Sequence, residues 1–346
     1  MQEYHSHKPV VFVTGATGYI AQHIIKQLLD SKRYMVVGSI RSEEKAKRLA
    51  KLFECSQDLS FEVVQDFRKP NAFHDVFQRC GPQIEYVMHT ATSVDLSCGD
   101  LEEGIIEPAI NGTDNILAAT SSFAPNVKKF IYTSSYGAMR SPEEDKDNMR
   151  IIDESSWNSL TMEEATQDGK TAYHYAKAQA EKLVWQWQKD WNNKLEVVVI
   201  CPTFTFGPQC FDAYVGKTLN ASCEPINLLV HGAPVNNAIK GYFADVRDVA
   251  RAHVESLTND NLNSKRLLIS ERRFCSLNVA KVIYSVLLQL KGTIAEEPTL
   301  TDAQNSSRFA HLDNKATRNV LPFELMSLEQ SLKDTVEQIL RVEDAK

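Results

Sequence analysis

The chain has 346 residues, 43% of them apolar, and a formal net charge of −7. This length suits one large α/β domain or a domain with a smaller lobe. No Lys/Arg run is long enough to predict a nucleic-acid partner, and no apolar run approaches the roughly 18 residues of a membrane span. The seven cysteines include no Cys-x-x-Cys pair, so we expect neither disulfides nor a metal site. We also expect a cytoplasmic location, where thiols stay reduced.

The first nine residues, MQEYHSHKP, are polar and lack the apolar stretch of a secretory signal. We expect residues 1–9 to form a flexible arm. An apolar run over 10–14 is typical of a buried strand. The chain continues as Gly15-Ala16-Thr17-Gly18-Tyr19-Ile20-Ala21, within which an amphipathic stretch begins.

A strand, a glycine-rich turn and a helix in this order begin a dinucleotide-binding βαβ unit. Gly15 allows a sharp turn, Gly18 allows the backbone to approach a pyrophosphate, and the small Ala21 lets the helix lie close to the strand. The N-terminus of that helix offers free N–H groups and a positive dipole end to phosphates. The spacing therefore predicts a bound dinucleotide.

Apolar, β-rich runs alternate with amphipathic stretches as far as residue 202. The predicted strands cover residues 10–14, 35–40, 61–65, 86–90, 129–134 and 196–201. The predicted helices cover residues 20–31, 43–53, 71–80, 101–121 and 172–191. Ser42 is the expected N-cap of the second helix. This alternation predicts an α/β fold with a Rossmann-type, doubly wound parallel sheet covered by helices on both faces.

The regular alternation ends at Pro202. We therefore predict that residues 10–202 form the dinucleotide-binding domain, and that residues 203–242 and 271–346 form most of a smaller, C-terminal substrate-binding lobe. Within the last of these ranges, residues 327–341 predict a closing helix.

Two segments beyond residue 202 are expected to return to the main sheet, near 243–258 and 266–270. The first of them reads as a strand end followed by a helix. Residues 292–325 contain no clear periodic pattern, so we expect irregular structure there.

Tyr173-His174-Tyr175-Ala176-Lys177 opens the last of the five predicted helices, and Ser135 follows the strand predicted over 129–134. A spacing of four places Tyr173 and Lys177 on one helix face, where the cation would lower the pKa of the phenol from about 10. Such a tyrosine can give a proton to a carbonyl oxygen as hydride reaches carbon, and a serine hydroxyl at a strand end can hydrogen-bond the same oxygen.

These segments resemble the extended short-chain dehydrogenases/reductases, in particular the yeast NADPH-dependent methylglyoxal/3-methylbutanal reductases and, more distantly, plant dihydroflavonol reductases. The resemblance runs almost from end to end, over residues 15–21, 38–42, 89–91, 108–112, 133–136, 154–157, 172–182, 206–209, 245–249 and 312–315. It implies that Ser135, Tyr173 and Lys177 are the catalytic trio, and that Asn111 supports Lys177 through water.

The end of the second predicted strand indicates the cofactor. NAD enzymes usually place Asp or Glu there for the ribose 2′-hydroxyl, whereas this chain has Arg41 and then Lys45, which suit a 2′-phosphate. We therefore expect NADP(H). With the further contacts that the resemblance implies, the predicted cofactor-binding residues are Gly15, Thr17, Gly18, Tyr19, Ile20, Arg41, Lys45, Asp66, Phe67, Thr90, Ala91, Tyr173, Lys177, Pro202 and Ser222.

The predicted substrate contacts are Val94, Ser135, Arg140 and Phe204. Val94 stands where the family usually has an aromatic residue, and Arg140 where relatives often carry an apolar or aromatic one. If Arg140 faces the pocket, it favours a carbonyl compound with a carboxylate, a phosphate or a polar oxygen. The alternative is that Arg140 points to water or pairs with a nearby acid, namely Glu143, Glu144 or Asp145.

The expected function is NADPH-dependent reduction of an aldehyde or ketone, with hydride from nicotinamide and a proton from Tyr173. Two alternatives stay open: an NAD-dependent nucleotide-sugar epimerase or dehydratase of the same fold, and a non-catalytic NADP-sensing protein. Arg41 argues against the first, and the Tyr173/Lys177 pair against the second. The physiological substrate, the stereochemical preference and the oligomeric state do not follow from the sequence.

Overall fold

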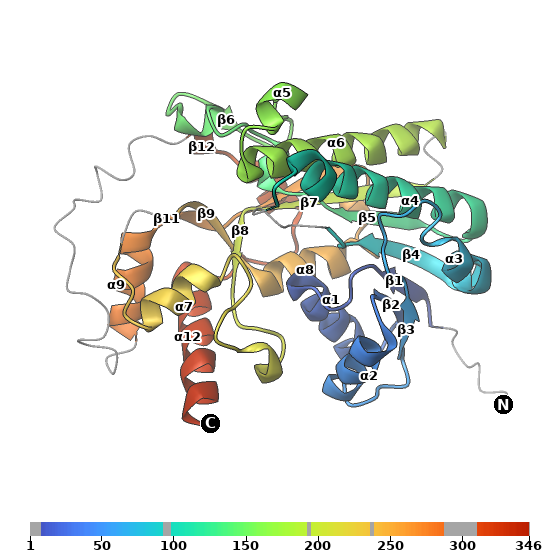
Figure 1. The fold of residues 1–346 in the computed structure, drawn as a ribbon, viewed down its shortest axis with the longest axis horizontal. Helices are drawn as coiled ribbons and strands as arrows, with labels where there is room; N and C mark the ends of the chain where they lie inside the picture. Colours follow the sequence, from blue (N-terminus) through green and yellow to red (C-terminus); the bar gives the residue numbers. More distant parts are fainter. Residues whose placement is uncertain (1–7, 93–97, 192–194, 236–238, 287–309, 346) are drawn as a thin grey trace.

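A computed structural model describes residues 8–92, 98–191, 195–235, 239–286 and 310–345. Its main sheet has seven strands in the order β10-β7-β5-β4-β1-β2-β3, and every neighbouring pair is parallel (Figure 1). The strands are β1 Val10–Val13, β2 Met35–Ile40, β3 Leu59–Val63, β4 Ile84–His89, β5 Lys129–Thr133, β7 Glu196–Pro202 and β10 Lys265–Ile269. The predicted Rossmann-type, doubly wound fold is confirmed.

Helices cover both faces of this sheet (Figure 1). One face carries α3 His74–Cys80, α4 Glu107–Phe123 and α6 Gly169–Asp190, and the other carries α1 Tyr19–Asp30, α2 Glu43–Leu52 and α8 Val246–Glu255. Side chains of β1 alternate between the two cores: Val10 and Phe12 enter the first, Val11 and Val13 the second. Burial on both faces explains why the strands read as continuous apolar runs.

The strand order reverses between β1 and β4, the neighbours that belong to different halves of the sheet. Ligands of open α/β sheets bind outside the carboxyl ends of the strands at such a switch point. The glycine-rich turn after β1 and the segment after β4 therefore flank the expected binding crevice.

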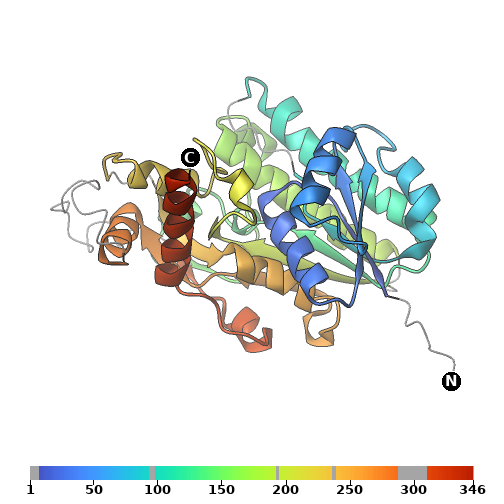
Figure 2. The same ribbon diagram turned by 90° about the horizontal axis from the view of Figure 1, so that it is seen from below.

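A second, three-stranded sheet in the order β11-β9-β8 lies beside the first. Its strands are β8 Phe204–Phe206, β9 Lys240–Asp245 and β11 Arg272–Cys275, and it packs with α7 Glu224–Val230, α9 Ser276–Val286 and α12 Leu328–Asp344. A separate apolar core joins these elements around Phe206, Phe243 and Phe274. Figure 2 shows α12, in dark red, on this side of the molecule, away from the blue helices under the main sheet.

The expectation that the chain near 243–258 joins the main sheet is wrong for its strand. β9 instead pairs in parallel with β8 and antiparallel with β11, because β10 occupies the sheet edge next to β7. The following helix, α8, does pack on the main sheet beside α1, and β10 joins the sheet near 266–270 as expected.

Several boundaries differ from the predicted ones for local reasons. The helix predicted over 101–121 begins as a π-helical turn, Glu102–Ile106, because Pro108 has no N–H to continue the α-helical pattern. α6 begins three residues early, because Asp168 accepts hydrogen bonds from the backbone N–H groups of Lys170 and Thr171. Ser42 caps α2 as predicted, with its Oγ accepting from the Lys45 N–H.

Short elements that the sequence did not predict complete the fold. They are β6 Ile151–Ile152, which pairs with β12 His311–Leu312, and α5 Met162–Ala165 and α11 Lys315–Val320. Single 3₁₀ turns occur at Gly81–Gln83, Tyr136–Ala138, Glu144–Lys146, Asp212–Tyr214 and Asp260–Leu262. β12 and α11 lie in the range expected to be irregular, and the closing helix is confirmed as α12.

The chain is already tied to the sheet before β1. Lys8 forms an ion pair with Asp58, and the carbonyl of Pro9 accepts a hydrogen bond of 3.0 Å from the backbone N–H of Met35. The flexible arm predicted over 1–9 therefore does not include Lys8 and Pro9, and residues 1–7 lie outside the described ranges.

Candidate active site

The turn after β1 has the backbone geometry that only glycine adopts easily. Gly15 has a φ of +68°, and a Cβ on it would lie 3.1 Å from the Ala91 Cα. A Cβ on Gly18 would lie 3.1 Å from the carbonyl oxygen of Gly15. The Gly15 N–H donates a 3.0 Å hydrogen bond to Ser39 Oγ, so the turn is anchored to the end of β2.

Thr14, which the sequence did not single out, joins the ends of β1 and β4. Its hydroxyl oxygen accepts hydrogen bonds of 3.0 Å from the backbone N–H groups of both Thr90 and Ala91. The hydroxyl proton is then directed to His89 Nδ1, 2.9 Å away. Burial lowers the pKa of His89 to about 3, so the ring is neutral and accepts this proton. The segment after β4 is thereby held against Gly15.

The remaining predicted cofactor residues differ in their exposure and in their contacts. Arg41 and Lys45 are exposed beyond the end of β2, and Pro202 ends β7. The Asp66 carboxylate accepts two hydrogen bonds from the Arg68 guanidinium, of 2.7 and 2.9 Å. Phe67 occupies the space where Gly112 has no side chain. Thr17, Ile20 and Ser222 are half-buried.

The Tyr19 side chain links the start of α1 to the segments around Gly207 and Cys223. Its hydroxyl donates a 2.6 Å hydrogen bond to the carbonyl of Gly207 and lies 3.4 Å from Cys223 Sγ. These contacts cross from the start of α1 to the segments beside the second sheet. The backbone N–H of Tyr19, in the first helical turn, is the group that would face a phosphate.

The predicted trio meets at the carboxyl end of β5. Ser135 lies two residues beyond β5 and accepts a 3.0 Å hydrogen bond from the Gly137 N–H, and its hydroxyl acts to lower the pKa of Tyr173. Lys177 is buried, and its Nζ donates a 3.0 Å hydrogen bond to the carbonyl of Thr133 in β5. α6 thus places Tyr173 and Lys177 next to Ser135, which is distant in sequence.

The electrostatics of the trio differ from the expectation. Burial raises the pKa of Tyr173, while its hydrogen bond with Ser135 acts in the opposite direction. Burial lowers the pKa of Lys177 to about 8, against the effects of Cys201 and Glu181. The expected depression of the Tyr173 pKa by Lys177 is therefore wrong for this state of the protein. The phenol is protonated at neutral pH, as a proton donor must be.

Two residues that the sequence analysis missed hold Ser135 close to α6. A Cβ on Gly137 would lie 2.5 Å from the His174 ring, so only glycine permits this approach. Asn158 Nδ2 donates 2.8 Å hydrogen bonds to the backbone carbonyls of both Gly137 and His174. A signal was present in the sequence, because Asn158 directly follows the family-like segment 154–157.

A buried ion pair lies behind Lys177, one helical turn further along α6. Glu181 is fully buried, and its Oε1 accepts a 2.6 Å hydrogen bond from Arg266 Nε of β10. Glu181 Oε2 accepts a 2.6 Å hydrogen bond from Ser134 Oγ, the neighbour of Ser135. This pair connects α6, β5 and β10 beneath the trio.

The other predicted residues have mixed positions. Asn111 is exposed on α4, and Phe204 is 38% exposed on β8 with its ring 5.7 Å from that of Phe274. The Arg140 side chain is only 8% exposed and its Nε lies 3.0 Å from Asp145 Oδ1. The pair with Asp145 agrees with one of the predicted alternatives. The prediction that Arg140 points to water is wrong. Val94 lies outside the described residues.

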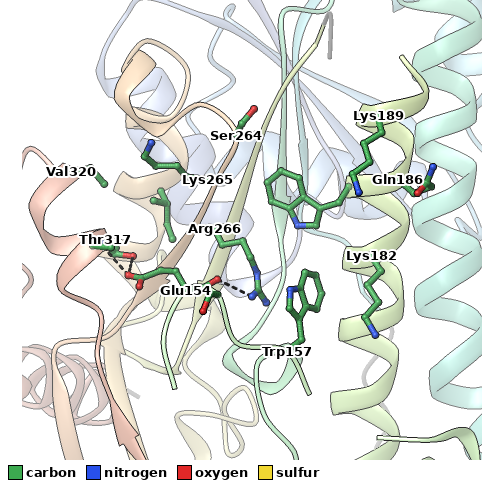
Figure 3. Close-up of a pocket in the computed structure, with 14 residues that line it drawn as sticks. Glu154, Trp157, Lys182, Gln186, Lys189, Ser264, Lys265, Arg266, Thr317 and Val320 are labelled. Carbon is green, nitrogen blue, oxygen red and sulfur yellow. Dashed lines mark hydrogen bonds between the residues drawn. The ribbon is translucent and has the colours of Figure 1, made fainter. Parts of the chain in front are cut away.

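A large surface cavity of about 860 Å³ lies elsewhere, between α6 and the edge strand β10 (Figure 3). None of the predicted site residues lines it. The Arg266 guanidinium stacks on the Trp157 ring at 4.0 Å there and is already bonded to Glu181 and to the carbonyls of Glu154 and Ser156. The cavity is therefore separate from the predicted trio. Across the described ranges, no helix is long and apolar enough to cross a membrane, and no group of three His, Cys, Asp or Glu could hold a metal ion.

Comparison with known proteins places the chain in a family. The model of the NAD dependent epimerase/dehydratase family matches residues 11–269. The NADPH-dependent methylglyoxal reductase of Saccharomyces cerevisiae is 37% identical over 338 residues, which are 96% of this chain and 98% of that protein. A ketoreductase of Aspergillus niger is 29% identical, over 95% of this chain and 97% of that protein.

Solved structures agree with this placement. The crystal structure of the yeast methylglyoxal/isovaleraldehyde reductase with NADPH has a TM-score of 0.92 and 37% identity, and the match covers 97% of this chain and all of that one. The UDP-glucuronic acid 4-epimerase of Bacillus cereus, at 17% identity and a TM-score of 0.70, shares the fold alone. The chain therefore belongs to the NAD dependent epimerase/dehydratase family, within the extended short-chain dehydrogenases/reductases that its sequence resembles.

Proposed function

We propose that the protein is an NADPH-dependent carbonyl reductase that converts an aldehyde or ketone to an alcohol. The observation that carries this proposal is the meeting of Ser135, Tyr173 and Lys177 at the carboxyl end of β5, beside the glycine turn. The related reductases that name NADPH in their descriptions support it. The seven free thiols support a location in the reducing cytosol.

The residues of the crevice fit a dinucleotide phosphate. The positive φ of Gly15 and the missing side chains at Gly15 and Gly18 leave the backbone open to a pyrophosphate at the start of α1. Arg41 and Lys45 would hold the 2′-phosphate, with the other predicted contacts along the crevice. When bound, NADPH supplies the hydride. The second sheet and its helices would form the substrate-binding lobe, with Phe204 at its edge.

The trio would handle the oxygen of the substrate. Ser135 would orient the carbonyl by donating a hydrogen bond, and Tyr173, kept protonated by its burial, would donate its hydroxyl proton to the same oxygen. Lys177, held on the Thr133 carbonyl, would stabilise the phenolate that remains and help to return a proton to it.

The proposed reaction is tested by following NADPH absorbance with a panel of neutral aldehydes and ketones. Oxidation of NADPH in proportion to alcohol formed is the expected result. An epimerase or dehydratase of this fold would instead retain NAD through purification, which extraction and chromatography of the bound nucleotide would detect. A protein that binds NADPH but oxidises it with no carbonyl of the panel would be a sensor, and the reductase proposal would be wrong.

The cofactor preference depends on Arg41. We expect Arg41→Ala to raise the KM for NADPH far more than that for NADH, because a charged hydrogen bond to the 2′-phosphate is worth roughly 1.5–3 kcal/mol, or about 10- to 150-fold. Steady-state kinetics with both cofactors measure the ratio. Arg33→Ala, which lies just before the other end of β2, is the control and should leave the ratio unchanged. An equal effect of Arg41→Ala on both cofactors would contradict the 2′-phosphate contact.

The pH profile should report Lys177. Because burial sets its pKa to about 8, the amine loses its proton as the pH rises through that value, and the positive charge beside Tyr173 disappears. We expect kcat/KM for carbonyl reduction to fall above about pH 8. Lys177→Arg keeps a permanent cation, so its slower reaction should lack this decline. A decline at the same pH in Lys177→Arg would assign it to another group.

A further inference from the structure

A basic cluster, of which Arg140 is the buried member, lies beside the trio. Arg140 is five residues after Ser135, and its guanidinium lies 4.5 Å from the centre of the Tyr136 ring and 3.0 Å from Asp145 Oδ1. Both side chains of this ion pair are largely buried, at 8% and 13% exposure. A guanidinium in such a place requires partners for all of its N–H groups.

Those partners are incomplete. Among the described residues, Arg140 Nε and Nη1 have no aligned hydrogen-bond acceptor, although both atoms are buried. The neighbouring His174 Nδ1, one residue from Tyr173, is also buried without a partner there. Unsatisfied buried polar atoms are costly in a native protein, which makes them candidates for contact with a ligand.

Several cations act on Asp145. Besides Arg140, three cations act on this carboxylate: Lys170 in the first turn of α6, Lys240 at the start of β9 and Arg273 in β11. Asp168, the N-cap of α6, adds a second acid near Lys170, but its oxygens accept from Thr171 and from two backbone N–H groups. Arg140 and Lys170 therefore belong to a group of cations around Asp145.

The cluster adjoins the reacting groups on two sides. Lys170 precedes Tyr173 by three residues on α6, so the two side chains lie about one helical turn apart. Arg140 follows the turn whose Gly137 touches His174. The strands β9 and β11, which carry Lys240 and Arg273, pair through Tyr242 and Arg273 and belong to the proposed substrate-binding lobe.

We propose that Arg140 and Lys170 form an anion-binding subsite for a carboxylate on the carbonyl substrate, with Lys240 and Arg273 adding positive field from the lobe. The proposal rests on the reductase function and narrows its substrate class to oxo acids. Arg140 would bind the carboxylate through the donors that Asp145 leaves unsatisfied, as guanidinium groups do. Because Lys170 lies a helical turn from Tyr173, the carboxylate should be separated from the carbonyl by several bonds.

The test compares oxo acids with their methyl esters, in a series with one to four carbons between carbonyl and carboxylate. In the wild-type enzyme we expect a higher kcat/KM for the acid than for the ester, with the largest ratio at the longer spacings. Arg140→Gln should lower this ratio by about tenfold or more, mainly through the acid. Lys170→Gln, an exposed position that is easier to change without loss of folding, should lower it less. Arg150→Gln, on the same loop but paired with Glu144 at the surface, is the matched control and should keep the ratio.

A second measurement does not depend on turnover. A dicarboxylate such as glutarate, compared with its dimethyl ester, should raise the melting temperature of wild-type protein loaded with NADP⁺, and Arg140→Gln and Lys170→Gln should weaken that rise. Reduction of esters with an unchanged acid-to-ester ratio in both variants would overturn the subsite but leave the reductase intact. Absence of any reduction together with variant-sensitive glutarate binding would overturn the reductase and support the subsite. Equal responses of wild type and variants to glutarate would overturn the subsite in either case.

Discussion

Tyr173→Phe should lower kcat for carbonyl reduction by about 10²- to 10⁴-fold, the usual contribution of a positioned general acid. The substitution removes one hydroxyl, and with it the interaction with Ser135, from a side chain whose position is set by α6. The ring remains, so the fold and the cofactor crevice should change little. Single-turnover reduction of a neutral aldehyde with saturating NADPH measures the loss.

The control for this variant is NADPH affinity, measured by fluorescence titration, which should stay within a few-fold of the wild-type value. Tyr175→Phe is the matched variant, because Tyr175 lies two residues away on the same helix, and it should reduce the aldehyde at nearly the wild-type rate. A Tyr173→Phe enzyme with an unchanged kcat would remove Tyr173 from the mechanism. A collapse of NADPH binding would assign it a role in the cofactor site instead.

Glu181→Gln should destabilise the folded protein by about 3–5 kcal/mol, the usual cost of removing one partner from a buried ion pair. Arg266 would remain 8% exposed with its charge uncompensated, and the amide could not accept from both Arg266 and Ser134 as the carboxylate does. Urea unfolding followed by circular dichroism measures the loss. Glu163→Gln, at an exposed position on α5, is the matched control and should change stability by less than about 0.5 kcal/mol.

A double variant of Glu181 and Arg266 tests whether the unpaired charge causes this loss of stability. Glu181→Leu combined with Arg266→Met removes both charges, and it should recover most of the stability that Glu181→Gln loses, because no buried charge is left unpaired. Glu181 also raises the pKa of Lys177, so in Glu181→Gln the decline of activity at high pH should begin at a lower pH. Equal losses of stability in the single and double variants would mean that packing, and not charge, explains the effect.

The sequence predicted those parts of the candidate site that appear as local patterns. A glycine that turns the chain after a strand and a Tyr and a Lys four residues apart on a helix are visible in short windows of sequence. The parallel sheet was equally predictable, because burial on both faces leaves continuous apolar runs such as that of β1. Boundaries shifted where one residue decided them, as Pro108 and Asp168 did.

The supports of the site were less visible, because each depends on residues that only the fold brings together. Thr14 meets the backbone after β4, and Asn158 joins Gly137 to His174. A threonine that follows a strand carries no local signal of such a role, and for Asn158 the signal was its place directly after the family-like segment 154–157. Their importance follows from hydrogen bonds between segments that are distant in the chain.

By itself the sequence determined the Rossmann-type sheet and the glycine turn, because periodic burial and residue spacing are local properties, and its resemblance to a family predicted the trio. Only the tertiary structure decided that β9 belongs to a second sheet, since strand pairing is a choice among distant partners. It also decided the charge states: burial raises the pKa of Tyr173 and lowers that of Lys177 to about 8. The tertiary structure also decided that Arg140 is buried and paired with Asp145, because both features depend on what the fold places around the guanidinium.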